Sequence, residues 1–535
     1  MAEGGQFGAI GRWVSSFPAG DSTRRTVLAY RMLSTKSQFT SLDRPDGMFC
    51  AMIGHWITGP RKRFLGSSVL ESIHQEDVAL VETQRSPRDM LVALLSQDLD
   101  FHDQVSDYAS HNLHSFPAKF PPQLPRKFIC ALTNPGESVL DPMMGSGTTV
   151  LEALLAGRQA IGIDIDPLAV LMSKVKTTPA NTLQVATLGD QISHQASLAV
   201  KEKRQMMETE LQRRWDSKTK EFVDYWFATE TQLELQALVE QIQRVTDADW
   251  RSLLMLTLSS IIITKSGGVS FALDLGHTRP HKARHVANKD GEVVFGESLP
   301  TSLTDRDKLL SKTIGSPLQE FGRRFRKNLN GLLEHREDAN MPLLAFGDAQ
   351  CLPITDGTVS LIVTSPPYAS NAIDYMRAHK FSLVWLGHAL DDLSAKRREY
   401  IGGEVVADGS LEALPPGTAE VVMQIGKLDR KKGRVLHRYY SEMTRALREM
   451  FRVLKPGKIA IVVVGTSVMR GRNTETATCL AEIGISVGFD VPKIGVRSLD
   501  RDRRMLPAAA TLDVGSQIQQ RMYEEYVIGF LKPEA

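Results

Sequence analysis

Short apolar runs that end in turns or polar residues recur along this chain of 535 residues. Residues 359–363 (VSLIV) are apolar except for one serine, and such a run is typical of a strand buried on both faces of a parallel sheet. Residues 160–163 and 459–464 (IAIVVV) have the same character, and residues 525–530 supply a late strand. An amphipathic helical pattern at 439–453 lies between two of these runs. The pattern predicts an α/β fold built on a mostly parallel sheet.

A long stretch between two of the strands interrupts this alternation. Helical patterns follow one another at 191–216, which is highly charged, and at 248–263, which is apolar and amphipathic. Residues 266–316 are rich in Gly, His, Arg and Pro and predict a loop or irregular lobe, and residues 319–336 predict a basic helix. Because about 170 residues separate consecutive strands here, whereas an ordinary crossover needs about a dozen, a largely helical inserted lobe is predicted at 179–341.

The sequence between residues 138 and 149 (SVLDPMMGSGTT) indicates a strand and a glycine-rich turn, after which a helix begins. Glycines allow the backbone to approach a ligand, and Asp164, which ends the next apolar run, would bind ribose hydroxyls. The turn is neither G-x-G-x-x-G nor G-x-x-x-x-G-K-[ST], so neither a pyrophosphate nor a triphosphate is the expected ligand. Asp141 would face a cationic or amino-bearing ligand. The alternative is that Asp164 or Asp166 only caps the next helix; Asp164 is favoured as the ligand-binding acid because it ends the apolar run.

The strand at 359–363 runs into Ser365-Pro366-Pro367-Tyr368. Two prolines fix φ and remove two backbone donors, so this corner is rigid and its carbonyls are free to accept hydrogen bonds. The Ser365 hydroxyl is a further acceptor, and Tyr368 offers a flat face for a planar ring. The segment therefore predicts a holder for an amino group on an aromatic heterocycle, with an ordinary strand-ending turn as the alternative.

At these two segments the chain resembles the amino-methyltransferases that use S-adenosylmethionine to modify DNA bases. The signatures of that family are an Asp-Pro-x-x-Gly-Ser-Gly-Thr loop and a Ser/Asn/Asp-Pro-Pro-Tyr tetrad. The resemblance extends to residues 111–120 (HNLHSFPAKF), which in such enzymes close over the methionine end of the cofactor, and to 346–349 (FGDA), whose Asp would meet the adenine amine. It covers roughly residues 105–175 and 342–535, and it implies a class I methyltransferase fold, Rossmann-like with a mostly parallel seven-stranded sheet.

The resemblance also implies roles for individual residues. The expected cofactor-binding residues are Phe116, Pro117, Asp141, Pro142, Gly145, Ser146, Gly147, Thr148, Asp164, Asp348 and Ala349, and the expected catalytic residues are Ser365, Pro366, Pro367 and Tyr368. The methyl group of a sulfonium is already activated, so S-adenosylmethionine is the expected cofactor and no metal is expected.

The expected domain organisation follows from these matches. Residues 1–100 form an N-terminal region without an assigned role, and 101–178 form the cofactor-binding half of the methyltransferase domain. A mainly helical insertion occupies 179–341. The catalytic half occupies 342–535 and contains a possible recognition insert at 388–437.

The tetrad suggests which atom is methylated. An exocyclic amine is a poor nucleophile because its lone pair is delocalised into the ring, and the Ser365 Oγ and the Pro366 carbonyl could localise that pair by accepting hydrogen bonds. The base must be flipped out of its duplex to reach them, with Tyr368 stacking on it. In the family, Ser-Pro-Pro-Tyr goes more often with cytosine N4 and Asp-Pro-Pro-Tyr with adenine N6. Cytosine N4 is therefore the favoured target and adenine N6 the alternative.

Two other functions are considered. Transfer RNA guanine-N2 methyltransferases share the loop and tetrad in this order, but they usually have Asp-Pro-Pro-Tyr and an N-terminal RNA-binding domain, for which the first hundred residues look too short and patternless. A catalytically inactive binding subunit with this fold is less favoured because Asp141, Gly145, Gly147, Asp164 and the tetrad are intact.

Composition is that of a globular protein, with 42% hydrophobic and 24% charged residues. There is no apolar run of about eighteen residues and no signal-type apolar segment at the N-terminus, so a cytoplasmic protein without a membrane span is expected. Four cysteines, Cys50, Cys130, Cys351 and Cys479, lack metal or disulfide spacing and are expected to be reduced and buried.

Local basic clusters, rather than the net charge of +2, bear on a nucleic-acid partner. The cluster at 277–289 (HTRPHKARHVANK) contains Arg279, Lys282 and Arg284, which are expected to contact DNA phosphate; a purely structural cap is the alternative. The two candidates for the region that recognises the DNA sequence are 266–340, which contains this cluster, and 388–437. The expected partners are double-stranded DNA and a cognate restriction system.

Overall fold

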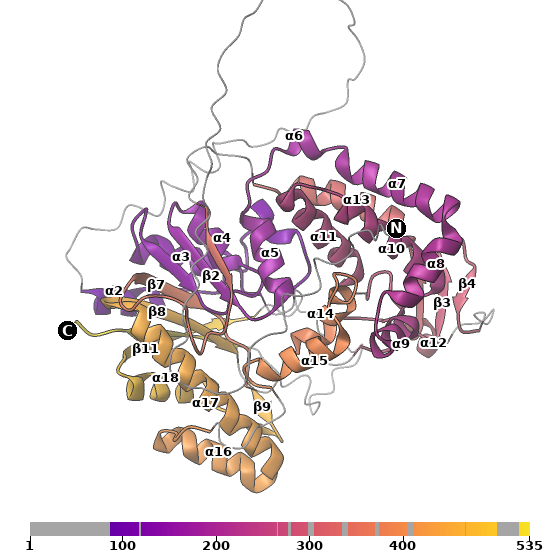
Figure 1. Cartoon of the computed structure of the whole chain (residues 1–535). Coiled ribbons are helices and arrows are strands. Elements are labelled where there is room, and N and C mark those ends of the chain that lie inside the picture. Colours follow the sequence, from indigo (N-terminus) through magenta and orange to yellow (C-terminus); the bar gives the residue numbers. More distant parts are fainter. Residues whose placement is uncertain are drawn as a thin grey trace, which may run out of the picture. The chain divides into compact units, whose positions relative to one another are not determined.

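The computed structural model describes residues 86–534 apart from 117–118, 265, 276–279, 298–303, 334–340, 370–373, 404–410, 466 and 500–523. Figure 1 shows the chain coloured along its sequence. Most of the N-terminal region predicted at 1–100 lies outside the described residues, as do Cys50, Pro117 and Arg279. Within the described ranges, no helix combines the length and apolar character needed to cross a membrane.

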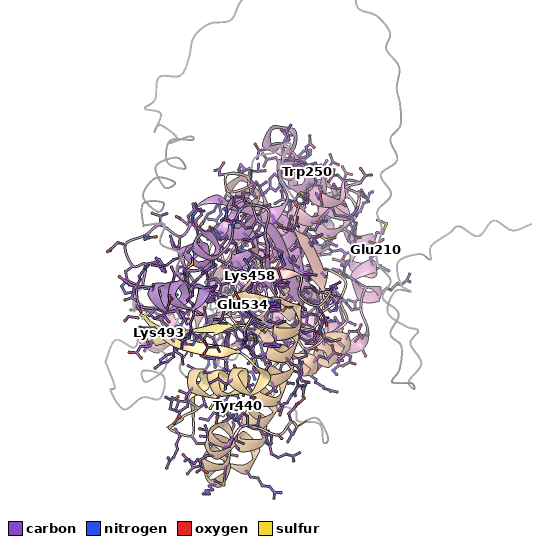
Figure 2. All side chains as sticks on the ribbon, turned by 90° about the vertical axis from the view of Figure 1, so that its left-hand side faces the viewer. Glu210, Trp250, Tyr440, Lys458, Lys493 and Glu534 are labelled. Atoms are coloured by element: carbon purple, nitrogen blue, oxygen red, sulfur yellow. The ribbon has the colours of Figure 1, made fainter. Side chains whose placement is uncertain are left out.

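A seven-stranded sheet has the order β11-β12-β8-β7-β1-β2-β6. Its strands are β1 (Ser138–Asp141), β2 (Gln159–Asp164), β6 (Leu343–Phe346), β7 (Val359–Thr364), β8 (Leu454–Gly465), β11 (Asp490–Ser498) and β12 (Glu524–Leu531). Neighbouring strands from β6 to β8 are parallel, and only β12 runs antiparallel to its neighbours β8 and β11. Figure 2 labels Lys493 on the edge strand β11 and Lys458 on β8. The predicted α/β fold with a mostly parallel seven-stranded sheet is confirmed.

Helices cover both faces of this sheet. One face packs its apolar side chains, such as Val139 and Ile461, against α2 (Pro87–Leu95), α3 (Gln123–Leu132) and α4 (Thr148–Leu155). The other face, with Leu140 and Val462, packs against α17 (Arg430–Val453), α18 (Thr476–Val487) and α16 (Pro416–Leu428). Strand residues that alternate between the two faces thus enter two separate cores, which is why residues 361–363 of β7 and 459–464 of β8 are all apolar.

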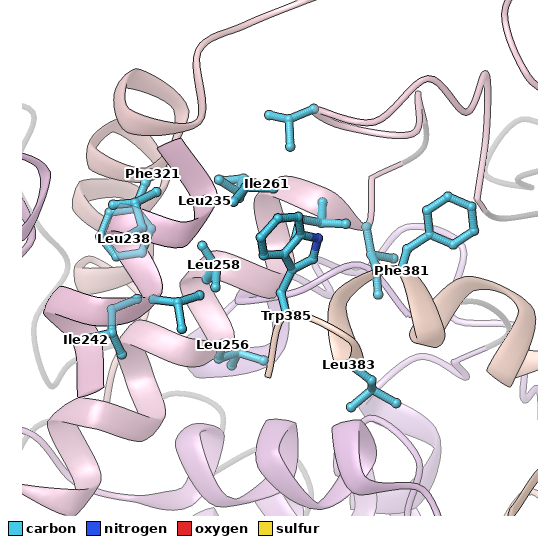
Figure 3. Close-up of a cluster of buried hydrophobic side chains, with 14 of the residues drawn as sticks. Leu235, Leu238, Ile242, Leu256, Leu258, Ile261, Phe321, Phe381, Leu383 and Trp385 are labelled. Carbon is cyan, nitrogen blue, oxygen red and sulfur yellow. The ribbon is translucent and has the colours of Figure 1, made fainter. Parts of the chain in front are cut away.

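The chain between β2 and β6 is mainly helical. Its helices are α5 (Pro167–Thr177), α6 (Thr182–Val185), α7 (Leu188–Glu202), α8 (Arg204–Arg213), α9 (Ser217–Trp226), α10 (Thr229–Gln243), α11 (Ala248–Ile262), α12 (Asp305–Leu309) and α13 (Pro317–Leu329). Figure 3 shows the core of this part, in which Phe381, Leu383 and Trp385 pack with side chains of α10 and α11. Phe381 and Leu383 belong to α14 (Tyr375–Leu383), the helix that follows the tetrad. The helices of the insertion therefore hold in place the segment that leaves the tetrad.

Several local predictions were wrong in detail. The stretch predicted as one charged helix at 191–216 forms two, α7 and α8, separated at Lys203. Residues 266–316 include a three-stranded sheet of β3 (His285–Asn288), β4 (Val293–Phe295) and β5 (Ser311–Ile314) rather than only loop. Helix α17 begins at Arg430 instead of near residue 439, because the Asp429 side chain caps it by accepting a hydrogen bond from the Lys432 backbone N–H. Cys130 and Cys351 are exposed, and only Cys479 of the described cysteines is buried.

Candidate active site

The carboxyl ends of four neighbouring parallel strands meet at one edge of the sheet. Asp141 ends β1, Asp164 ends β2, Asp348 follows β6 and Ser365 follows β7. Ligands of open α/β sheets bind at this edge, and here the four side chains line one pocket. The sequence-predicted residues that line it are Phe116, Asp141, Pro142, Gly145, Ser146, Thr148, Asp164, Asp348, Ala349, Ser365 and Pro367.

The glycine-rich turn wraps closely around the end of β2. Gly145 and Gly147 have φ values of +48° and +73°, which favour glycine. The Gly147 N–H donates to the Met144 carbonyl at 2.7 Å, and the Gly145 N–H donates to Asp164 Oδ2 at 2.8 Å. A Cβ atom on Gly147 would lie 2.5 Å from Ser173 Oγ. Gly147 therefore permits the close approach of α4 to α5, while Gly145 exposes backbone to the pocket.

Asp164 and Asp166 have different roles in the structure. Asp164 accepts backbone hydrogen bonds from Gly145 at one oxygen and from Asp166 at the other, both at 2.8 Å, and it faces the pocket. Asp166 is the N-cap of α5, accepting from the Leu168 and Ala169 N–H groups, and its Oδ2 lies 2.6 Å from His379 Nδ1. Helix capping thus falls to Asp166, although Asp166 also lines the pocket, and Asp164 lines the pocket at the end of its strand without capping a helix.

Burial controls the protonation of these carboxyl groups. Burial, and after it the nearby Asp166 carboxylate, raise the pKa of Asp164 to about 7. Burial also raises the pKa of Asp141 to about 6, although the Thr364 hydroxyl donates to Asp141 at 2.6 Å. Burial acts to raise the pKa of Asp166 as well, but the charge and hydrogen bond of His379 lower it below its usual value. A cation or a set of hydroxyl donors in the pocket would stabilise the ionised forms of Asp141 and Asp164.

The tetrad residues divide between the pocket and the protein interior. Ser365 and Pro367 line the pocket, whereas Pro366 is buried. Tyr368 does not belong to the lining; its hydroxyl donates to Glu525 Oε1 on β12 at 2.9 Å, and burial followed by the Glu525 charge raises the pKa of Tyr368 well above its usual value. Glu525 also pairs with Arg497 of β11 at 3.2 Å. The hydroxyl of Tyr368 is therefore tied to the antiparallel edge of the sheet.

Several residues that line the pocket were not predicted from the sequence. Among the described residues that line it, Lys119 is the one cation; its Nζ donates to the His111 carbonyl at 2.8 Å, and burial lowers its pKa. The ring of Tyr375 stacks on that of Phe116 with centroids 5.1 Å apart. Lys119 lies within the motif at 111–120 and could have been inferred from it. Glu399, Tyr400 and Ile401 also line the pocket, and no local signal marks them.

The predicted DNA contacts lie elsewhere. The ammonium of Lys282 lies 4.0 Å from the centroid of the Phe295 ring and 4.1 Å from that of Tyr225, within the range of cation–π attraction. Arg284 is exposed, and Arg279 is outside the described residues. Lys282 is thus held against aromatic rings, and contact of these residues with DNA stays a prediction.

The pocket suits S-adenosylmethionine on its own chemistry. The turn at Gly145 lets a ligand approach the backbone, Asp141 and Asp164 offer buried carboxylates to a cation and to ribose hydroxyls, and Lys119 offers a partner to a carboxylate. Tyr375 and Tyr400 provide aromatic surface for a planar base. Together with the strand order, this pocket defines a class I methyltransferase.

Comparison with known proteins shows similarity to DNA methyltransferases. A family model described as DNA methylase matches residues 69–175. Type II methyltransferase M.MvaI from Kocuria varians is 24% identical over 414 residues, covering 72% of this chain and 84% of that protein. Type II methyltransferase M.BglI from Bacillus subtilis is 48% identical over 56 residues, covering 10% of this chain and 16% of that protein. A TehB-like SAM-dependent methyltransferase from Corynebacterium glutamicum has 10% identity and a TM-score of 0.24, with 76% of this chain and 86% of that chain covered.

The chain is similar to the amino-methyltransferases of the DNA N4/N6 family, and its cofactor is S-adenosylmethionine. The glycine-rich loop and the tetrad, on which the resemblance was based, lie at the one pocket that the four strand ends form.

Proposed function

We propose that this protein transfers a methyl group to the N4 amine of a cytosine flipped out of double-stranded DNA. The observation that carries the proposal is that Ser365 and Pro367 line the same pocket as Asp141 and Asp164. The Ser365 hydroxyl, an acceptor for an amine, and a site for the methyl donor are thus adjacent, as in-line transfer requires.

The cofactor would be held by the groups at the strand ends. Asp164 would accept hydrogen bonds from the ribose hydroxyls, and Asp348 would accept from the adenine amine. Lys119 would pair with the methionine carboxylate, and Asp141 would lie against the cationic end of the molecule. The Gln350 side chain donates to both Asp348 oxygens at 3.2 Å and in turn accepts from Arg445 at 2.8 Å, so Asp348 is held in one orientation.

When bound, S-adenosylmethionine supplies a methyl group already activated by its sulfonium charge. The protein then has to position and activate the amine. Ser365 Oγ and the Pro366 carbonyl would accept the two amine hydrogens, which draws the nitrogen lone pair out of the ring and toward the methyl group. Positive charge that develops on the amine is stabilised by the same acceptors.

A serine at the first tetrad position favours cytosine N4 as the target. Its hydroxyl is a weaker acceptor than a carboxylate, and it leaves more of the task to the proline carbonyl. An adenine N6 target remains the second candidate because its amine would make the same two hydrogen bonds. The proposal includes a cytoplasmic location and a cognate restriction nuclease that cuts the same DNA site when it is unmethylated.

Methyl transfer from labelled S-adenosylmethionine tests the proposal. Duplex DNA, transfer RNA and a sample without nucleic acid are offered in parallel, and labelled DNA is digested to nucleosides for mass spectrometry. The expected product is N4-methylcytosine in duplex DNA, formed about 100-fold more slowly when Ser365→Ala replaces the wild type. Detection of N6-methyladenine would contradict only the proposed target base. Label in transfer RNA only, or in neither nucleic acid, would contradict the proposal that duplex DNA is the substrate.

A further inference from the structure

A dense group of cations surrounds the N-terminal end of α17. Between residues 427 and 434, five of the eight residues are Lys or Arg and one is Asp. A short hairpin of β9 (Val468–Met469) and β10 (Arg472–Asn473) adds Arg470 and Arg472. Figure 1 shows α16, α17 and β9 next to one another. This basic edge is defined here as residues 427–434 together with 470–472.

The hairpin is fixed to the helix. Arg470 donates to Asp429 Oδ2 from Nε at 2.8 Å, and Asp429 is also the N-cap of α17. About three turns further along α17, the Tyr440 hydroxyl donates to the Thr474 carbonyl at 2.6 Å. Positive φ values at Arg470 and Gly471 form the tight turn at the tip. Arg470 therefore has a structural partner, and the arrangement presents its neighbours in a defined position.

Three of the remaining cations have no such partner. Arg430, Lys431 and Arg472 are exposed, and none of them has an ion pair or side-chain hydrogen bond to any residue that the structure describes. Cations that have no counter-charge repel one another, and an anionic partner would reduce this repulsion.

Helix α17 connects this basic edge to the lining of the active-site pocket. Arg438, eight residues into α17 from Arg430, donates to the carbonyls of Arg398 at 2.6 Å and of Tyr400 at 3.5 Å. Tyr400 lines the pocket. At a rise of 1.5 Å per residue, the start of α17 is about 12 Å from this contact. The hairpin, in turn, leaves the carboxyl end of β8, which is parallel to and paired with β7, the strand that ends in the tetrad.

We infer that this basic edge binds the phosphate backbone of the duplex whose base enters the pocket. The start of α17 and the hairpin, which leaves the carboxyl end of β8, lie at the edge of the sheet that carries the pocket, so phosphates near a flipped base would reach these side chains. The inference rests on the proposed function, because it takes the DNA substrate from it. It assigns a second set of DNA contacts that does not involve the cluster at 277–289.

A triple substitution, Arg430→Ala with Lys431→Ala and Arg472→Ala, tests the inference in the full chain. The logarithm of the affinity falls as the logarithm of the salt concentration rises. Each lost phosphate contact makes this fall less steep by about 0.9, so the loss of three contacts makes it less steep by about 2.7. The ratio of wild-type to variant affinity for a duplex oligonucleotide should therefore shrink about 40-fold between about 50 and 200 mM salt. The KM for DNA should rise, while the affinity for S-adenosylhomocysteine stays that of the wild type.

Two controls make the result specific. Lys201→Ala with Lys203→Ala and Arg213→Ala removes the same charge from exposed positions on and between α7 and α8, and it should leave the salt slope unchanged. The swap Arg430→Lys, Lys431→Arg and Arg472→Lys should retain binding, because phosphate contact needs charge rather than the planar geometry that base recognition by Arg requires.

The outcomes separate this inference from the proposed function. If the wild type methylates duplex DNA but the triple alanine variant keeps its DNA affinity and salt slope, this basic edge is not a DNA contact and the proposed function stands. An equal loss in the α7–α8 control would overturn the inference in the same way. A wild type that transfers no methyl group to DNA would instead refute the proposed function.

Discussion

Two substitutions at Tyr368 separate its ring from its hydroxyl and test whether the ring is a platform for the flipped base. Tyr368→Phe removes the O–H that donates to Glu525 Oε1 at 2.9 Å and keeps the aromatic face. Tyr368→Leu removes the same O–H and the aromatic face but keeps an apolar side chain that can pack on the neighbouring core. The two variants are therefore matched in the hydrogen bond that they lose.

The expected magnitudes differ between stability and activity. Glu525 is 8% exposed, and a buried acceptor without its donor costs about 1–3 kcal/mol. Both variants should lose about this much free energy of unfolding in urea titrations. Stacking of a base on an aromatic ring is worth about 1–3 kcal/mol, so Tyr368→Leu should lower kcat/KM for duplex DNA about 5- to 150-fold relative to Tyr368→Phe. Calorimetry with S-adenosylhomocysteine should give wild-type affinity for both.

Three results would refute the reasoning. Equal methyl transfer by the Phe and Leu variants would show that the ring does not hold the base. A loss of transfer by Tyr368→Phe as large as that of Tyr368→Leu would place the hydroxyl and Glu525 in the catalytic arrangement instead. Loss of cofactor binding in a folded variant would contradict the division between the cofactor residues and the tetrad.

Ser365→Ala should lower kcat about 100-fold, as expected for loss of one transition-state hydrogen bond, with unchanged cofactor affinity in calorimetry; a wild-type kcat would remove Ser365 from the amine site. Asp164→Ala should weaken S-adenosylhomocysteine binding by about 1–3 kcal/mol, and unchanged affinity would reject Asp164 as the ribose partner. Because the pKa of Asp164 is about 7 and the ionised form accepts hydroxyl hydrogen bonds, wild-type affinity should rise with pH through about 7, and titrations of Asp164→Ala across the same pH range should lack this rise. Gly147→Ala should destabilise the fold by about 2–5 kcal/mol, from left-handed strain and the 2.5 Å approach to Ser173 Oγ. Gly136→Ala, also at positive φ but with open space around it, should cost only about 1–2 kcal/mol in the same urea titrations, and equal costs would contradict the close contact at Gly147.

The sequence alone determined the parts of this protein that depend on neighbours in the chain. The strands around Asp141, Asp164 and Ser365 were visible because a strand buried on both faces must be apolar throughout. The loop at Gly145 and the tetrad were visible because close approach to a ligand and a rigid corner require particular residue types at fixed spacing.

Tertiary structure decided the roles that depend on residues far apart. Asp164 and Asp166 are equivalent candidates for helix cap in the sequence, and the assignment follows from the position of Asp166 at the start of α5 and its contact with His379, which is 213 residues away. Tyr368 is tied to Glu525 across 157 residues because β12 inserts between β8 and β11, an order that no local pattern encodes.

The same reason separates the cations. Lys282 and Arg430 both lie in basic stretches of the sequence, yet Lys282 is held against the rings of Tyr225 and Phe295 and Arg430 is exposed at the start of α17. The sequence shows only that a residue is a cation and does not show what surrounds it. Whether aromatic side chains, a carboxylate or solvent surrounds that cation is set by the packing of distant elements, and this packing determines which cations remain available to a partner.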